Sequence, residues 1–336
     1  MEDAMKSPTG QGTVARFAEL RIPASDFASN QANEQFARMR AERPPYYDAI
    51  EQGDIASIRK VWDECETLPA LEAARALYSV DIRSTEIGGI RAEIVTPSDG
   101  PAPENRDKLL VNLHGGGFIS GSYARGLLEA VPVAGIGRIT VATLDYRLSP
   151  EHIFPAASED IAAAYRALLA DYRPECIGLY GCSAGGTLAA EAIPWLEKEG
   201  SPRPGAIAMI CSNAARMGVG DSMHLARALG TTVPMAPNLR WYFDGTDARD
   251  PMVSPCASAD VLRRFPPTLL MSASRDFFLS HTTHFHLELV KADVEAQLCV
   301  WDGLWHGFVW SPELPEAAEA YRIMTAFFRK HLGRAA

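Results

Sequence analysis

Apolar residues along the chain change their spacing near residue 79, and this change separates two kinds of predicted structure. In residues 12–78 they recur at three- and four-residue intervals among charged residues, which predicts helices. The segments that carry this pattern are VARFAEL, ANEQFARMRAE, SIRKVWDECE and PALEAARALY. The next two segments, SVDIRSTEI and IRAEIVTP, predict a pair of antiparallel strands that ends in the Pro- and Gly-rich turn SDGPAPEN.

After this turn, short apolar runs alternate with longer amphipathic segments. The runs predict strands at LLVNLHG, ITVATLDY, CIGLYG, AIAMICS, TLLMSAS and EAQLCVWDG. The segments between them predict helices at about 123–135, 156–172, 184–199, 280–292 and 315–332. Buried strands that alternate with amphipathic helices predict an α/β fold, in which helices cover both faces of a mostly parallel, eight-stranded sheet.

Residues 212–250 interrupt this alternation between two predicted strands and contain Met, Trp and Tyr. Together with residues 1–78 they predict a helical cap over the carboxyl ends of the strands, where open α/β sheets bind ligands. The predicted core then consists of residues 79–211 and 251–336.

The composition is that of a globular chain, since 47% of the 336 residues are hydrophobic and 22% are charged. The formal net charge of −10 argues against nucleic acid and anionic membrane as partners, because both favour a basic surface. The N-terminal segment MEDAMKSPTG lacks the apolar stretch of a signal peptide, and no apolar run reaches the roughly 18–20 residues that span a bilayer. We therefore expect a cytoplasmic protein.

Neither the cysteines nor the histidines show the spacing of a metal site. The six cysteines are scattered without a CxxC pair, so we expect reduced and mostly buried thiols. His281, His284 and His286 form the segment HTTHFH, but on a helix only the first two share a face. The sequence therefore predicts no metal and no cofactor.

The segment CIGLYG-CSAGG places a serine between a strand and a helix. Gly181, Cys182, Ser183, Ala184 and Gly185 form a G-x-S-x-G motif, in which small residues two positions either side of the serine allow a sharp strand-to-helix turn. Such a turn exposes the serine hydroxyl above the sheet, at the positive end of the helix. The motif alone is also compatible with a purely structural turn. It predicts Ser183 as a nucleophile only together with further groups.

A run of glycines follows the strand LLVNL, in the segment His114-Gly115-Gly116-Gly117. Consecutive glycines leave backbone N–H groups free to turn toward a developing alkoxide. We expect the amides of Gly115 and Gly116, with that of Ala184, to form an oxyanion hole. A phosphate-binding loop is disfavoured, because no Lys-Ser/Thr pair follows the glycines.

A serine nucleophile needs a base, and the base needs an acid that orients it. Asp276 follows the strand TLLMSAS and His306 follows EAQLCVWDG, so both stand after late strands and in the order serine, acid, base. Asp302 is an alternative acid, less favoured because it lies close to His306 in sequence. The predicted triad is Ser183, Asp276 and His306.

These segments resemble the hormone-sensitive-lipase family of α/β-hydrolases, in particular its bacterial esterases. HGGGFISGS, DYRLSPEHIFPAA, GCSAGGTLA, SRDFF and GLWHGF match blocks of the family in the same order, from about residue 80 to the C-terminus. The resemblance implies an α/β-hydrolase fold with a cap, hydrolysis of carboxylic esters without a cofactor, and a possible homodimer. Two departures stand at Cys182, where the family often has Asp or Thr, and at Phe277-Phe278, where it usually has Pro-Leu.

The predicted function is therefore a serine carboxylesterase that acts on short- to medium-chain esters as small-molecule substrates. A lactone, amide or natural-product ester hydrolase with the same triad stays open. A non-catalytic ligand receptor is disfavoured by the intact His306, and a true lipase by the lack of a long apolar surface. Candidate substrate-binding residues, chosen for their nearness to the motifs or the cap, are Phe118, Met217, His224, Trp241, Tyr242, Phe277 and Trp305.

Overall fold

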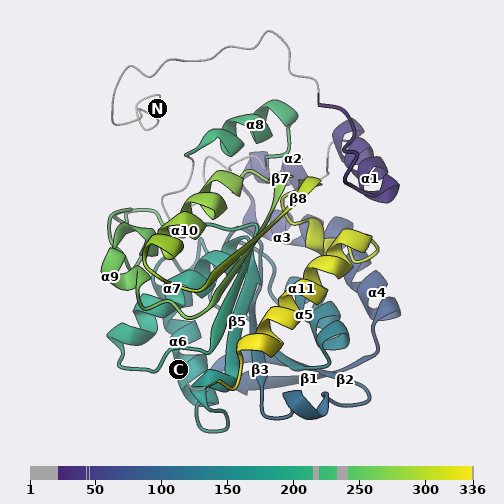
Figure 1. The fold of residues 1–336 in the computed structure, drawn as a ribbon. Coiled ribbons are helices and arrows are strands. Elements are labelled where there is room, and N and C mark those ends of the chain that lie inside the picture. The colour runs from purple at the N-terminus through teal and green to yellow at the C-terminus, as the bar shows by residue number, and fades with distance from the viewer. Residues whose placement is uncertain (1–21, 43, 45, 215–218, 233–240, 335–336) are drawn as a thin grey trace.

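The computed structural model describes residues 22–42, 44, 46–214, 219–232 and 241–334, and a single sheet runs through its centre (Figure 1). Within these residues the sheet has eight strands in the order β1-β2-β4-β3-β5-β6-β7-β8. β2 is antiparallel to both of its neighbours and all other pairs are parallel, which confirms the predicted topology. The strands are β1 (Val80–Ile87), β2 (Ile90–Pro97), β3 (Leu109–Leu113), β4 (Thr140–Leu144), β5 (Ile177–Cys182), β6 (Ala206–Ile210), β7 (Thr268–Arg275) and β8 (Ala296–Trp305).

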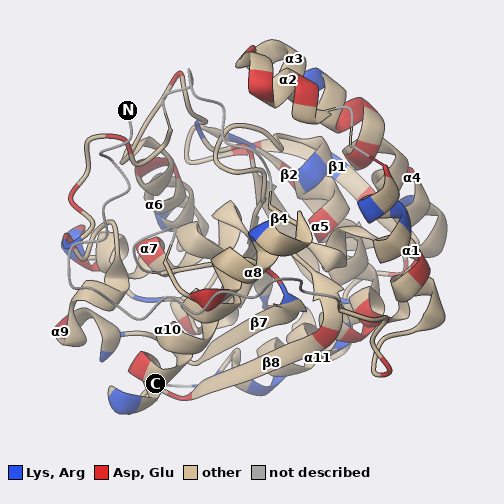
Figure 2. Cartoon of the chain, turned by 90° about the horizontal axis from the view of Figure 1, so that it is seen from above, with Lys and Arg blue, Asp and Glu red and all other residues tan. Residues whose placement is uncertain are grey.

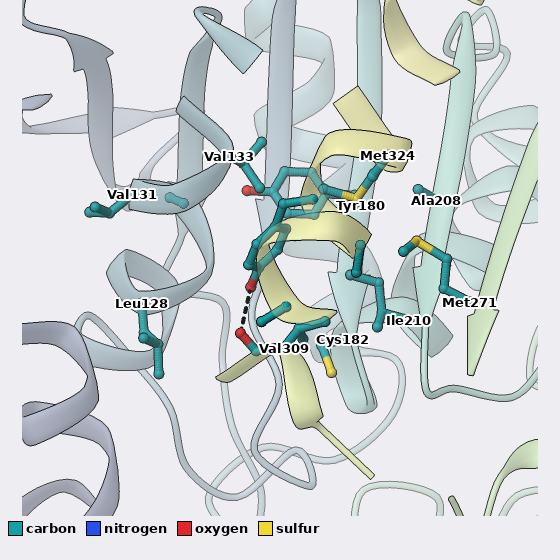
Figure 3. Packing of buried hydrophobic residues seen from close by; sticks show 14 of the residues in the cluster. Leu128, Val131, Val133, Tyr180, Cys182, Ala208, Ile210, Met271, Val309 and Met324 are labelled. Carbon is teal, nitrogen blue, oxygen red and sulfur yellow. Dashed lines mark hydrogen bonds between the residues drawn. The ribbon is translucent and has the colours of Figure 1, made fainter. Parts of the chain in front are cut away.

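The central strands are apolar along their whole length because helices cover both of their faces. Every residue of β3, β5 and β6 is buried. Successive side chains of β5 alternate between two apolar clusters, so that Tyr180 and Cys182 lie in one and Leu179 in the other. Figure 3 shows Tyr180 beside Val133 of the helix that follows β3 and Met324 of the last helix, with Cys182 nearer to Val309 and Ile210.

The helices that alternate with the strands form two layers. α5 (Ala124–Gly137) and α11 (Pro315–His331) pack together on one face, whereas α6 (Ala156–Leu168), α7 (Ala184–Lys198) and α10 (Leu279–Lys291) lie on the other (Figure 1). Their positions confirm the predicted helices. The largest difference is at α6, which ends at Leu168 instead of near 172, because the amides of Ala170 and Asp171 bond to carbonyls three residues back and close the chain into turns.

The N-terminal part consists of short helices, as its apolar spacing predicts. They are α1 (Asn30–Ala41), α2 (Tyr46–Gln52), α3 (Ile55–Trp62), a π-helical turn (Asp63–Thr67) and α4 (Leu68–Leu77). The helix predicted over VARFAEL lies outside the described residues, and α2 was not predicted, because its seven residues carry too little periodic pattern. Taken together, the helices α1 to α4 carry both acidic and basic residues (Figure 2).

The N-terminal helices contact the rest of the molecule at several points. Leu71 and Ala74 of α4 belong to the apolar cluster that contains Leu127 of α5. Arg59 of α3 donates to the Ile119 carbonyl at 2.6 Å, in the loop that follows β3. The N-terminal helices are therefore tied both to the core and to the glycine-rich loop.

Helix α8 (Asp221–Leu229) lies near the ends of β7 and β8 (Figure 1). Its Ser222 hydroxyl donates to the Phe277 carbonyl at 2.8 Å and accepts from the Ser280 amide at 2.9 Å. These bonds join the segment after β6 to the loop after β7. α9 (Ala259–Leu262) completes the helices of the described residues.

The cysteines follow the prediction only in part. None of the six forms a disulfide, and Cys176, Cys182 and Cys211 are buried, but Cys256 and Cys299 are half-buried and Cys65 is exposed. No helix in the described part of the chain is both long and apolar enough to cross a membrane.

Candidate active site

Ser183 sits between β5 and α7 in a backbone conformation that side chains rarely adopt. Its φ is 56° and its ψ is −120°, so the chain reverses sharply at this residue. The amide of Ser183 donates to the Ile210 carbonyl at 2.8 Å, which fixes the turn to the next strand. The backbone is therefore strained at the one position where the motif predicts a nucleophile.

The glycines of the motif are required by close backbone packing. A Cβ added to Gly181 or to Gly185 would overlap the carbonyl oxygen of Leu113 at the end of β3. The closest approach is at Gly185, where the carbonyl carbon of Leu113 would also lie within 2.5 Å. The predicted steric reason for these glycines is confirmed.

His306 lies between Ser183 and Asp276 and is hydrogen-bonded to both. Its Nε2 is 2.9 Å from Ser183 Oγ, and its Nδ1 is 2.8 Å from Asp276 Oδ1. With Nδ1 protonated toward the carboxylate, Nε2 is free to accept the serine proton. Asp276 follows Ser183 by 93 positions in sequence, and His306 follows Asp276 by 30. The fold thus brings the three predicted residues together.

The Asp276 carboxylate is completely buried and accepts further hydrogen bonds. Ser272 Oγ donates to Oδ2 at 2.7 Å, and the Phe278 amide donates to Oδ1 at 3.0 Å. Burial raises the pKa of Asp276, but the neighbouring His306 and these donors outweigh it, so the pKa lies below its ordinary value. Asp302, the alternative acid, is exposed and accepts from Ser25 Oγ at 2.5 Å, away from His306.

The glycine-rich loop presents amides beside this triad, but not the set expected from the sequence. The Gly115 amide donates to Glu129 Oε1 at 2.9 Å, which leaves it unavailable for an oxyanion. Among the described residues no acceptor is recorded for the amides of Gly116, Gly117 and Ala184. Gly116 and Gly117 have φ values of +129° and +62°, which turn the loop back on itself and which glycine adopts without strain.

His114, which begins this loop, is structural. Its ring stacks on Tyr146 with centroids 4.3 Å apart, and burial lowers its pKa to about 4, so it is neutral at pH 7. Tyr146 donates its hydroxyl proton to the His114 carbonyl at 2.6 Å. These contacts hold the start of the loop against the core.

The two residues that depart from the family pattern have different surroundings. Phe277 is half-buried and stacks on His306, with ring centroids 4.0 Å apart. Cys182 is completely buried in the apolar cluster; burial raises the pKa of its thiol, and the adjacent Cys211 thiol raises it further. Phe277 therefore belongs to the site, whereas Cys182 packs beneath it.

Cys211 is a neighbour of the triad that the sequence analysis did not identify. Its sulfur lies with an Asp276 oxygen and a His306 nitrogen within 4.8 Å of one another, the single group in the described residues with such donor spacing. The nitrogen and oxygen are already joined by the 2.8 Å hydrogen bond, as in an acid–base pair. Only its position after the strand AIAMI pointed to this residue.

The other candidate substrate-binding residues are distributed between core, surface and site. Phe118 and Tyr242 are buried and stack on each other at 4.8 Å, and Tyr242 Oη accepts from the Ala157 amide at 3.2 Å. Trp305 is buried in the core near Phe36. All three side chains therefore have packing partners within the protein, and their role in substrate binding stays a prediction. His224 is exposed, Trp241 is half-buried, and Met217 lies outside the described residues.

Several known proteins are similar to this chain over most of its length. A family described by its α/β-hydrolase fold matches residues 110–310. An acetyl-hydrolase from Streptomyces hygroscopicus is 32% identical over 254 residues, which cover 74% of this chain and 82% of that protein. The structure of esterase E25 has a TM-score of 0.83 at 28% identity and covers 95% of this chain and 99% of its own. An esterase from the bacterial hormone-sensitive lipase family has a TM-score of 0.70 at 27% identity, over 87% and 100% of the two chains.

Proposed function

The chain belongs to the α/β-hydrolase family and, like the bacterial hormone-sensitive-lipase-type esterases it resembles, is a carboxylic ester hydrolase; on this premise we propose that Ser183, His306 and Asp276 are its catalytic triad. The observation that carries this assignment is the continuous pair of hydrogen bonds, 2.9 Å from Ser183 Oγ to His306 and 2.8 Å from His306 to Asp276. The His306 ring and the hydrogen bonds from Phe278 and Ser272 lower the pKa of Asp276 in spite of its burial, which keeps that carboxylate ionised at neutral pH.

The reaction proceeds by acyl transfer to the serine. Ser183 Oγ attacks the ester carbonyl carbon while its proton moves to His306 Nε2, and the carbonyl oxygen becomes an oxyanion. The amides of Gly116, Gly117 and Ala184 donate to that oxygen. His306 then returns the proton to the departing alcohol, and a water molecule releases the acid by the same steps. Asp276 holds the imidazole in the tautomer that this exchange requires.

The substrates are small-molecule carboxylic esters. We propose acyl chains of short to medium length, in agreement with the acetyl-hydrolase among the similar proteins. Residues 1–78 and 212–250 are proposed to cap the site, which the hydrogen bonds between Ser222 and the loop after Asp276 support. A cytoplasmic location and a homodimer remain predictions, to be tested by cell fractionation and by light scattering of the purified protein.

Hydrolysis of p-nitrophenyl esters tests the triad and the substrate range together. Ser183→Ala is expected to abolish turnover of p-nitrophenyl acetate while the melting temperature stays close to that of the wild type. A series from acetate to decanoate, with a panel of small lactones beside it, then measures chain length and substrate class. Turnover by Ser183→Ala equal to that of the wild type would contradict the assignment.

A further inference from the structure

Glu129 is a buried carboxylate on α5, a helix whose one other charged residue is Arg125, one turn earlier. Only 1% of the surface of Glu129 is exposed. A charge in such a place is strongly destabilising unless it is hydrogen-bonded. The hydrogen-bond partners of Glu129 therefore indicate its role.

Three donors meet the Glu129 carboxylate, each from a different part of the chain. The Gly115 amide and Trp310 Nε1 both donate to Oε1 at 2.9 Å, and Asn112 Nδ2 donates to Oε2 at 2.9 Å. Asn112 is fixed in this orientation because its Oδ1 accepts from Thr143 Oγ1 at 2.8 Å. Burial raises the pKa of Glu129 above its ordinary value, and the three donors and the nearby Arg125 guanidinium offset only part of that rise. All the partners are donors, which is the set that an ionised carboxylate accepts.

Resting on the triad and oxyanion hole proposed above, we propose that Glu129 is a positioning residue that fixes the oxyanion loop against the segment of the catalytic base. Gly115 directly precedes the oxyanion donors Gly116 and Gly117, and Trp310 stands four residues after His306. One oxygen of Glu129 accepts from both sides. The two halves of the catalytic machinery are thereby held at a fixed separation.

The surroundings of Trp310 make this link rigid. The Trp310 ring lies against the Gly115 backbone, so that a Cβ on Gly115 would lie 2.5 Å from Trp310 Cζ2. The guanidinium of Arg125 lies 4.2 Å from the centre of the same ring, and the His306 ring meets it edge-on at 6.0 Å. The loop, the indole and the imidazole thus form one packed unit around Glu129.

A looser oxyanion loop lowers the rate more than it weakens substrate binding. The donors must stand in place before the oxyanion forms, since an amide that first has to reorient stabilises the transition state less. The ground-state ester depends little on these donors. Weakening the Glu129 anchor is therefore expected to lower kcat and leave KM nearly unchanged.

The test compares Glu129→Gln with Glu191→Gln, two substitutions of completely buried carboxylates. Glu191 lies on α7 and accepts from Ser158 Oγ at 3.3 Å, and within the described residues it forms no hydrogen bond with the oxyanion loop. In Glu129→Gln an NH2 donor replaces one of the two carboxylate oxygens. It either faces the Asn112 donor or takes the place of the oxygen that accepts from both Gly115 and Trp310. With p-nitrophenyl acetate, its kcat is expected to fall about ten- to a hundredfold at constant KM, whereas Glu191→Gln stays within about twofold of the wild type.

A second readout separates positioning from a loss of stability. A trifluoromethyl ketone forms a hemiketal oxyanion on the serine, so its inhibition constant is expected to rise in Glu129→Gln by the same factor as kcat falls. Should this variant fail to fold, Trp310→Phe removes one donor and keeps the ring; it is expected to lower kcat severalfold and weaken the inhibitor in parallel. Wild-type kcat and inhibitor affinity in a folded Glu129→Gln, or in Trp310→Phe, overturn the proposal. If Ser183→Ala is inactive in the same experiments, such a result refutes only the role of Glu129 and does not contradict the proposed triad.

Discussion

The ring of Phe277 lies on the imidazole of His306, with centroids 4.0 Å apart and planes inclined by 24°. Phe277 directly follows Asp276 in sequence, so one short segment supplies both the carboxylate on Nδ1 and an aromatic face on the ring. Phe278 meets the same imidazole edge-on at 5.6 Å. His306 is thus held by aromatic contacts as well as by its hydrogen bonds.

Phe277→Leu is expected to lower kcat about two- to fivefold. The imidazole becomes positively charged when it takes the serine proton, and an aromatic face attracts that charge by about 0.5–1 kcal/mol where it is partly exposed. Leucine keeps the apolar contact and loses this attraction. Steady-state kinetics with p-nitrophenyl acetate measures the effect. Phe285→Leu, in the core beside Phe265, serves as control and should lower the melting temperature with kcat unchanged; equal kcat values in both variants would contradict the role of the ring.

Asp276→Asn is expected to lower kcat by about 10³–10⁴. The asparagine retains the shape, but its amide can present a donor to His306 Nδ1, which favours the tautomer in which Nε2 carries the proton and cannot accept another. Single-turnover hydrolysis measures the loss. Asp302→Asn is the matched control. Asp302 bonds to Ser25, so the activity of this variant should equal that of the wild type. A large loss in Asp302→Asn, with Asp276→Asn active, would make Asp302 the acid.

The stability of the wild type relative to Asp276→Asn is expected to decrease as the pH falls below about 4. The folded-state pKa of Asp276 is lower than its unfolded value of about 3.9, so the unfolded state binds the proton first. The ionised carboxylate therefore stabilises the folded protein above that unfolded pKa, and this contribution is lost as the pH falls through the folded pKa. Urea unfolding of both proteins at pH 7, 5, 4 and 3 measures the difference. A difference that is constant with pH would show that the pKa is not lowered.

Ser183→Gly is expected to be inactive and about 1 kcal/mol more stable than Ser183→Ala. The positive φ of Ser183 is costly for any residue with a Cβ, and glycine adopts it without that cost. Alanine removes the hydroxyl and keeps the strain, so the pair separates backbone strain from lost hydrogen bonds. Thermal unfolding of the two inactive variants provides the measurement, and equal stabilities would mean that the turn is unstrained.

The sequence predicted the triad because its members occupy equivalent positions at strand ends. Parallel strands bring their carboxyl ends to one edge, so Ser183, Asp276 and His306 could be placed together from the strand pattern alone. The steric need for Gly181 and Gly185 followed from the same turn geometry.

What the sequence did not predict depends on the register of packed elements. Glu129 is the one acid of α5, and only the docking of this helix brings it to Gly115 and Trp310. The choice of oxyanion amides depends on the φ angles within the glycine loop. Trp305 illustrates the same limit: it is the last residue of β8 and packs into the core, whereas His306 begins the turn after it and reaches Ser183.

Gly185→Ala is expected to destabilise the fold by more than about 3 kcal/mol, or to prevent accumulation of folded protein. Its Cβ would overlap the Leu113 carbonyl, a backbone group of the neighbouring strand β3 that can move only if the strand or the nucleophile turn moves with it. Gly245→Ala is the matched control, because Gly245 has a φ of +83° and open space around it. An alanine there causes backbone strain without overlap, which costs about 1 kcal/mol. Urea unfolding measures both. Because the excess cost at Gly185 comes from the approach of β3 to the turn, equal losses in the two variants would show that this approach is looser than the structure has it.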